Sequence, residues 1–150
     1  MTAGGALARG PSREHLALPF FDDRHRAFAE RVSDFAAGLA PTIDHKDADK
    51  SCRKLVADLG KAGFLDVCCP PGNDVIDSRL VCIARESLAW HDGLADFALA
   101  MQGLGTGAVS LAGSEELKAT VLSKTRAGQW LAAFALSERD AGSDLSLIHI

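Results

Sequence analysis

The sequence predicts a mainly α-helical domain that leads into the first strand of a further domain. Two observations support the helices: apolar residues recur at three- or four-residue spacing in several segments between residues 19 and 128, and Pro or Gly residues separate some of these segments. A third observation supports the strand. After Gly128 the pattern changes to a short and uniformly apolar run, "QWLAAFALS", which is typical of a buried strand.

The first part of the chain predicts a tail and two helices. Residues 1–18 show no periodicity, and we expect them to form a flexible N-terminal tail. The first helix is expected to begin at a capping Asp22 or Asp23 and to end at Pro41. The second is expected to run from near Asp49 to Gly63. A loop containing Pro70, Pro71 and Gly72 follows it.

The second part of the helical region predicts a long helix and two shorter ones. The long helix is expected from Asp77 or Ser78 to about Ala100, and it is apolar nearly all the way round, as central helices of bundles are. The small-residue segment "QGLGTGAVSLAG" then predicts a short, tightly packed helix. Ser114 is expected to cap a final helix with two glutamates in its first turn. The helical domain therefore spans residues 19–128.

Composition and charge limit the classes of function. The net charge of −4 is scattered along the sequence without a basic stripe, so we expect no nucleic-acid partner. The first residues lack a continuous apolar core of signal-peptide length, and we expect a cytoplasmic protein. Residues 97–114 contain no acidic or basic side chain and could be mistaken for a membrane span. Their glycines and polar side chains argue against that interpretation.

Four cysteines occur, Cys52, Cys68, Cys69 and Cys82, and they form no CxxC pair. No histidine lies at zinc-ligand spacing from them. We therefore expect no metal site, and we interpret the adjacent Cys68 and Cys69 as reduced thiols packed in a loop.

Two short motifs invite a functional interpretation but lack the expected context. Gly103–Ala108, "GLGTGA", fits the G-x-G-x-x-G/A dinucleotide pattern, which needs a strand before it, whereas a helical pattern precedes it here. Close packing through glycine is the preferred interpretation, and a Rossmann-type nucleotide binder is an alternative. The neighbours His91 and Asp92 point in different directions on a helix, so they are not preset for acid–base chemistry.

The segment "FALSERDAGSD", Phe134 to Asp144, has stronger local chemistry. A buried strand would deliver Ser137 at its end, and Gly142 permits close approach of the backbone to a ligand. The N–H groups of residues 141–143 can form a concave set of donors suited to an anion such as a pyrophosphate. An ordinary turn with Asp140 and Asp144 as caps explains the same residues equally well.

A resemblance to a known family separates these two interpretations. The stretch "SEELKATVLSKTRAGQWLAAFALSERDAGSD" resembles the acyl-CoA dehydrogenase family, in which such a helix leads into a strand and then a flavin-binding signature. The whole signature is present from Phe134 to Asp144, and the likeness extends over residues 18–144. It implies the family's N-terminal helical bundle, followed by residues 129–144 as the first strand and flavin-binding turn of a middle β domain.

Two departures from the family pattern stand out. Arg139 occupies a position where proline is common, which loosens the turn without removing a ligand group. Residues 145–150, "LSLIHI", do not resemble the family and look like translated sequencing-adapter DNA. We expect them to be a non-native tail.

The resemblance implies an FAD-dependent enzyme that removes hydrogen from the α- and β-carbons of an acyl-CoA to give a 2-enoyl-CoA. The residues implied to contact the flavin ring are Phe134, Ala135, Leu136 and Ser137. Gly142 and Ser143 are implied to approach the pyrophosphate, and Ser143 also the acyl-CoA. Implied partners are an acyl-CoA substrate, electron-transfer flavoprotein as electron acceptor, and further copies in a homo-oligomer.

The family's catalytic base is a glutamate of its C-terminal helical domain, and no residue of this chain matches that motif. We therefore assign no catalytic residue and expect a truncated part of the enzyme, inactive alone and binding FAD weakly or not at all. The helices would expose an apolar patch that the enzyme normally covers. A non-catalytic helical interaction module remains a second alternative.

Overall fold

The computed structural model describes residues 10–72 and 75–137, and this part of the chain contains five α-helices and three short 3₁₀ turns. The α-helices are α1 (Asp23–Leu39), α2 (Ala48–Lys61), α3 (Ser78–His91), α4 (Gly93–Ala112) and α5 (Glu115–Arg126). The 3₁₀ turns are η1 (Glu14–Ala17), η2 (Ala40–Thr42) and η3 (Phe64–Val67). The predicted mainly α fold class is confirmed.

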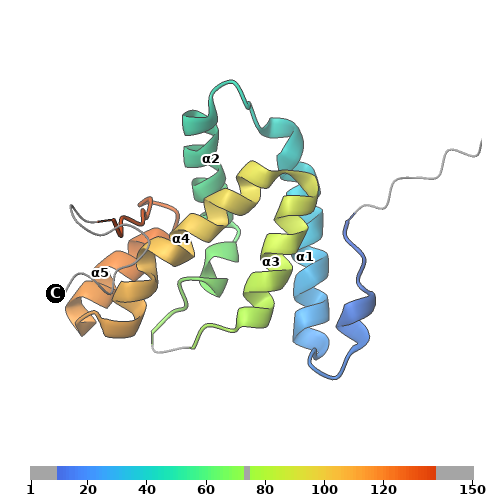
Figure 1. Cartoon of the computed structure of the whole chain (residues 1–150), viewed down its shortest axis with the longest axis horizontal. Coiled ribbons are helices and arrows are strands. Elements are labelled where there is room, and N and C mark those ends of the chain that lie inside the picture. Colours follow the sequence, from blue (N-terminus) through green and yellow to red (C-terminus); the bar gives the residue numbers. More distant parts are fainter. Residues whose placement is uncertain (1–9, 73–74, 138–150) are drawn as a thin grey trace, which may run out of the picture.

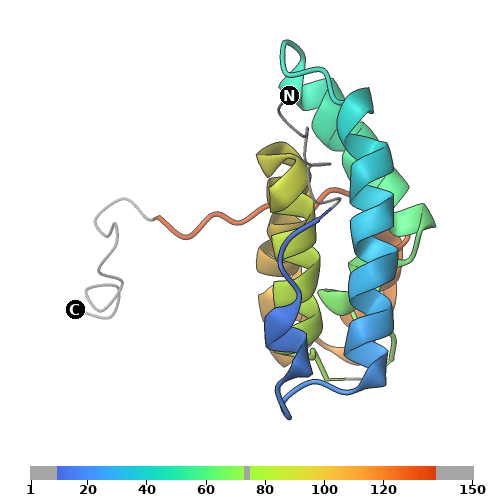
Figure 2. The ribbon, with the colours of Figure 1, turned by 90° about the vertical axis from the view of Figure 1, so that its right-hand side faces the viewer.

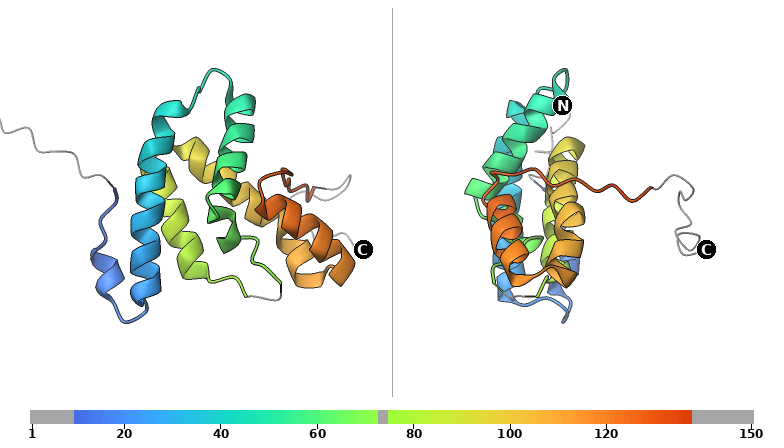
Figure 3. Two further views of the ribbon diagram at one scale, coloured as in Figure 1. Left: turned by 180° about the vertical axis from the view of Figure 1, so that it is seen from behind. Right: turned by 90° about the vertical axis from the view of Figure 1, so that its left-hand side faces the viewer.

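The helices form two layers. α1 packs against α3, and α4 packs against α2, α3 and α5 (Figure 1). Seen edge-on, α1, α2 and α5 lie in one layer and α3 and α4 in the other (Figures 2 and 3). The core between the layers is apolar, and its most completely buried side chains include Val32, Leu55, Leu59, Leu65, Leu88 and Leu99.

Each α-helix begins at a short polar residue whose side chain accepts a hydrogen bond from a backbone N–H of the first turn. The capping residues are Asp22, Asp47, Asp77, Asp92 and Ser114. The caps satisfy N–H groups that have no partner within the helix, so these five positions fix where the helices start.

The predicted long helix from Ser78 to Ala100 is wrong, because the helix is interrupted at Asp92 and a second helix begins there. The backbone of Asp92 is extended (φ −162°, ψ 123°), and its carboxylate caps α4 through the N–H of Leu94 at 2.8 Å. The small-residue segment is not a separate short helix either, since it continues α4 to Ala112. Apolar residues seemed to surround one helix because two helices with different buried faces follow each other directly.

Residues 10–18, assigned to a flexible tail from the sequence, pack against α1. Leu16 in η1 is 4% exposed and belongs to the core. Arg13 donates a hydrogen bond to the carbonyl oxygen of Ala29 at 3.1 Å, and Arg26 donates one to that of Leu16 at 2.8 Å. One buried leucine in an aperiodic segment carries no helical period, so the sequence pattern did not reveal this packing.

Helix α4 is long and apolar enough, by length and composition, to cross a membrane, and it is the one such helix in the described ranges. A core helix of a soluble protein can meet the same criterion. In this structure α4 packs against three other helices through a face that includes Ala95, Ala98, Leu99, Gln102 and Thr106.

The strand predicted after Gly128 does not form within residues 10–72 and 75–137. Residues 131–137 have neither helix nor strand structure, and they cross α4 and lead away from the bundle (Figures 2 and 3). A strand is stabilised by a ladder of hydrogen bonds to a neighbouring strand. The described part of the chain provides no such neighbour, so apolar content alone does not produce the strand.

Candidate functional site

The predicted ligand-contacting segment begins where the chain leaves α5. Gly128 has a positive φ of 69°, and the N–H of Trp130 donates to the carbonyl oxygen of Lys124 at 3.3 Å. The ammonium group of Lys124 lies 4.5 Å from the centre of the Trp130 ring, a cation–π arrangement. These contacts turn the chain back toward α4.

One buried side chain then holds the segment against α4. The Oε1 atom of Gln102 accepts a hydrogen bond from the N–H of Ala132 at 2.8 Å. Its Nε2 atom donates to the carbonyl oxygen of Ala98 at 3.0 Å, and the residue is only 2% exposed. Sequence reasoning missed Gln102, although a glutamine within a long apolar helix is a signal that a buried polar partner exists.

Beyond this contact, the predicted flavin-contacting residues lie on the surface. Phe134 and Leu136 are each 49% exposed, and Ala135 and Ser137 are exposed as well. Among the described residues, the backbone groups of Phe134 to Ser137 have no hydrogen-bond partner. Their N–H and C=O groups are therefore open to a ligand's polar edge, and the two large side chains offer apolar surface. Gly142 and Ser143 lie outside the described residues.

The "GLGTGA" motif lies inside α4, and residues 97–102 before it are helical. A dinucleotide site of the Rossmann type needs a strand and a turn at these positions, so that alternative is wrong. Gly103 and Gly105 instead face neighbouring chain segments: a Cβ at Gly103 would be 3.0 Å from that of Cys68, and one at Gly105 would be 2.7 Å from that of Ala132. The interpretation as close packing through glycine is confirmed.

The neighbours His91 and Asp92 do not act on each other. Asp92 caps α4, and its Oδ2 atom lies 2.8 Å from Nε2 of His45. The Nε2 atom of His91 is buried and has no hydrogen-bond partner within the described parts of the chain. The structural interpretation of this pair is therefore preferred.

Cys68 and Cys69 are buried thiols, as expected from the sequence. The sulfur of Cys69 lies 3.2 Å from the hydroxyl oxygen of Thr106. Hydrogen bonding between the two thiols raises the pKa of Cys68 and lowers that of Cys69 to about 7. In the described residues, no group of three His, Cys, Asp or Glu side chains could hold a metal ion.

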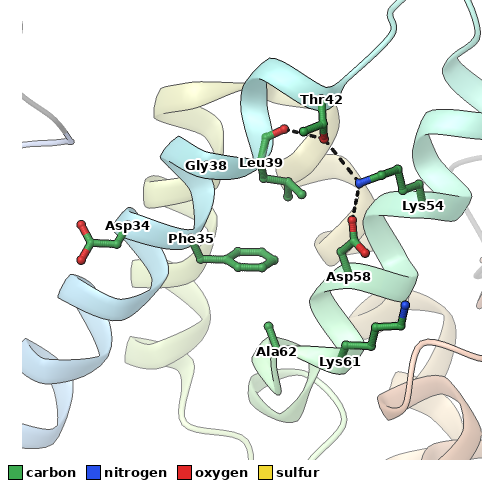
Figure 4. Close-up of a pocket in the computed structure, with 9 residues that line it drawn as sticks. All are labelled: Asp34, Phe35, Gly38, Leu39, Thr42, Lys54, Asp58, Lys61 and Ala62. Atoms are coloured by element: carbon green, nitrogen blue, oxygen red, sulfur yellow. Dashed lines mark hydrogen bonds and ion pairs between the residues drawn. The ribbon is translucent and has the colours of Figure 1, made fainter.

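A groove of about 570 Å³ opens between α1 and α2 (Figure 4). The ring of Phe35 points into it from α1, and Lys54, Asp58 and Lys61 line it from α2 (Figure 4). The ammonium group of Lys54 pairs with Asp58 and lies 3.5 Å from the hydroxyl oxygen of Thr42. The groove contains none of the predicted site residues.

Comparison with known proteins decides the family. Residues 22–129 match the model of "Acyl-CoA dehydrogenase, N-terminal domain", which covers most of the chain. The chain belongs to the acyl-CoA dehydrogenase family. The five helices described above correspond to the N-terminal domain of that family.

Individual relatives agree with this assignment. The chain is 38% identical over 140 residues to "Probable acyl-CoA dehydrogenase FadE25" of Mycobacterium tuberculosis, covering 91% of this chain and 36% of the relative. It is 31% identical over 126 residues to "Cyclohexane-1-carbonyl-CoA dehydrogenase" of Geobacter metallireducens, covering 82% of this chain and 32% of the relative. The chain therefore spans about a third of the length of these acyl-CoA dehydrogenases.

Proposed function

We propose that this chain supplies the helical domain and one flavin-contacting wall of an FAD-dependent acyl-CoA dehydrogenase. The enzyme would convert an acyl-CoA thioester into a 2-enoyl-CoA. The observation that carries this proposal is the match of residues 22–129 to the family, followed directly by the signature Phe134–Asp144. The exposed backbone of Phe134 to Ser137, which has no hydrogen-bond partner among the described residues, supports it, since open N–H and C=O groups can hydrogen-bond to the polar edge of a flavin ring.

FAD, when bound, supplies the acceptor for the hydride that leaves the β-carbon of the substrate. The residues of this chain bind and orient. Backbone groups of Phe134 to Ser137 and the Ser137 hydroxyl would contact the ring, while Phe134 and Leu136 would help to exclude water from it. By resemblance to the family, Gly142 and Ser143 would contact the pyrophosphate, and Ser143 also the acyl-CoA.

The wider setting is also proposed from the family. An acyl-CoA is the substrate, electron-transfer flavoprotein accepts the electrons, and the enzyme is a cytoplasmic homo-oligomer. The 150 residues alone would hold FAD weakly and would not catalyse, because a preorganised site needs supporting residues around it.

Two measurements test this proposal. Reading the gene beyond codon 150 should show a continuation with a second flavin-contacting strand and a later glutamate, and the protein so encoded should reduce a dye when given an acyl-CoA. A true stop codon there would instead favour the helical interaction module. Mixing the 150-residue chain with FAD, an acyl-CoA and the dye should give no reduction above a buffer control. Reduction by the short chain would refute its proposed inactivity.

A further inference from the structure

The chain approaches the proposed flavin wall through two fixed points, and the first is the turn after α5. A Cβ at Gly60 of α2 would lie 2.5 Å from the backbone nitrogen of Gly128, and one at Gly128 would lie 2.6 Å from the carbonyl oxygen of Val56. Distances under 3.0 Å are essentially never seen for real Cβ atoms. The α2 backbone and the turn therefore touch each other directly, and this contact sets where the segment starts.

The second fixed point is the contact between Gln102 of α4 and Ala132, which lies two residues before Phe134. The N–H of Ala132 donates to the buried Oε1 atom of Gln102 at 2.8 Å. A buried amide oxygen without its donor is unfavourable, so this contact favours a single position of Ala132. Because the Nε2 atom of Gln102 is bound to the carbonyl oxygen of Ala98, the side chain is itself held in one orientation.

Gly105 allows the segment to lie directly on the helix. A Cβ at this position would be 2.7 Å from both the Cβ of Ala132 and the backbone nitrogen of Ala133, and 2.8 Å from the carbonyl oxygen of Ala133. Any larger residue would push the segment away from α4. Gly107, two positions further along the same helix, has nothing within 4 Å of the corresponding point.

We propose that Gln102 and Gly105 are positioning residues of the flavin site. They dock residues 131–133 on α4 and thereby set the position of the Phe134–Ser137 backbone that contacts the flavin ring. The inference rests on the proposed flavin-binding role of Phe134–Ser137. It adds two α4 residues that do not themselves touch the cofactor.

The docking is tested by hydrogen exchange, on the millisecond-to-minute scale, in the 150-residue chain. Gln102→Met keeps a side chain of similar length but removes the acceptor, and Gly105→Ala adds the obstructing Cβ. Both changes should speed exchange at the Ala132 amide by about tenfold or more, because local opening then exposes it. Gly107→Ala is the matched control and should leave that rate unchanged. Unchanged exchange in the first two variants would overturn the proposal.

The link to flavin is tested by repeating the exchange, with and without saturating FAD, in the longer protein that the proposed function requires the gene to encode. FAD should slow exchange at Phe134–Ser137 in the wild type and in Gly107→Ala, and this effect should be lost in Gln102→Met and Gly105→Ala. Equal FAD protection in all four proteins would overturn the positioning role. If FAD protects no residue in the wild type, the proposed flavin function of the segment fails and the positioning role fails with it. That case is recognised because Ala132 still responds to the substitutions.

Discussion

The Nε2 atom of the fully buried His25 lies 3.1 Å from the carboxylate of Asp77, a residue 52 positions further along the chain. The Nδ1 atom of the same ring lies 2.8 Å from the carboxylate of Asp22. Asp22 caps α1 and Asp77 caps α3, so one imidazole joins the starts of two adjacent helices. The buried ring therefore links the N-terminal ends of α1 and α3.

Replacing His25 with leucine should lower the free energy of unfolding by about 2–3 kcal/mol, because the polar contacts of the buried ring with Asp22 and Asp77 are lost. Chemical denaturation at neutral pH measures this change. His45→Leu is a matched control. His45 also contacts a capping aspartate, Asp92, at 2.8 Å, but its side chain is 66% exposed. Its loss should cost less than about 1 kcal/mol. Equal costs for the two variants would contradict the role assigned to burial.

The stability of the domain should fall in acid partly because of Asp77. Hydrogen bonding from Arg79, together with that from His25, holds the pKa of the Asp77 carboxyl well below its usual range. A carboxyl with a lowered folded-state pKa stabilises the fold above its unfolded pKa of about 3.9, and this contribution is lost as the pH falls through that range toward the folded value.

Asp77→Asn isolates this effect, because asparagine keeps the capping ability but not the charge. At neutral pH the variant should be less stable by about 1 kcal/mol. The difference between the two proteins should shrink progressively below about pH 3.9. Urea denaturation of both proteins over a series of pH values measures the difference. A gap that stays constant down to pH 2 would exclude a contribution from the Asp77 charge.

Gly60 should be intolerant of even one added methyl group. The Cβ of Gly60→Ala would meet backbone atoms of Ala127 and Gly128 at 2.5–2.7 Å, so α2 or the turn after α5 must move. We expect a loss of about 2 kcal/mol, measured by thermal or chemical denaturation. Gly38→Ala in α1 is the control, since nothing lies within 4 Å of its Cβ. It should stabilise the domain by up to about 1 kcal/mol through helix propensity.

The outer face of α4 should make the chain self-associate. Phe97, Leu104 and Leu111 are 55%, 53% and 86% exposed, which is unusual for large apolar side chains on one helix. Light scattering of the wild type should show a mass that rises with concentration. The triple change of these residues to Gln should reduce that rise without lowering stability. Changing the exposed Phe20 and Val75, which lie outside α4, should leave it unaltered.

Much of the helical fold could be predicted from the sequence because its signals are local. Capping residues such as Asp22 and Ser114 act on N–H groups two or three positions away, so their effect is visible within a short window. Asp92 carries the same signal. It was missed because the apolar pattern continued on both sides of it, and the cap rather than the pattern decides where α4 begins.

The candidate site could be predicted only in part. The residues Phe134–Ser137 follow from the signature string, whereas Gln102 and Gly105 depend on a contact between positions about 30 residues apart. Nothing in the local pattern of α4 indicates that Ala132 lies on it. The predicted strand failed for the same reason, since a strand depends on a partner that a local pattern does not contain.

The sequence by itself determined the helical class, most of the helix starts and the family, because propensity, capping and a contiguous motif act over a few residues. Only the tertiary structure decided that His25 is buried between two caps, that Leu16 joins the core, and that the glycines of α4 accommodate another segment. These features arise from contacts between distant parts of the chain. The free energy of such contacts depends on burial and on the distance between atoms, which a local sequence pattern does not specify.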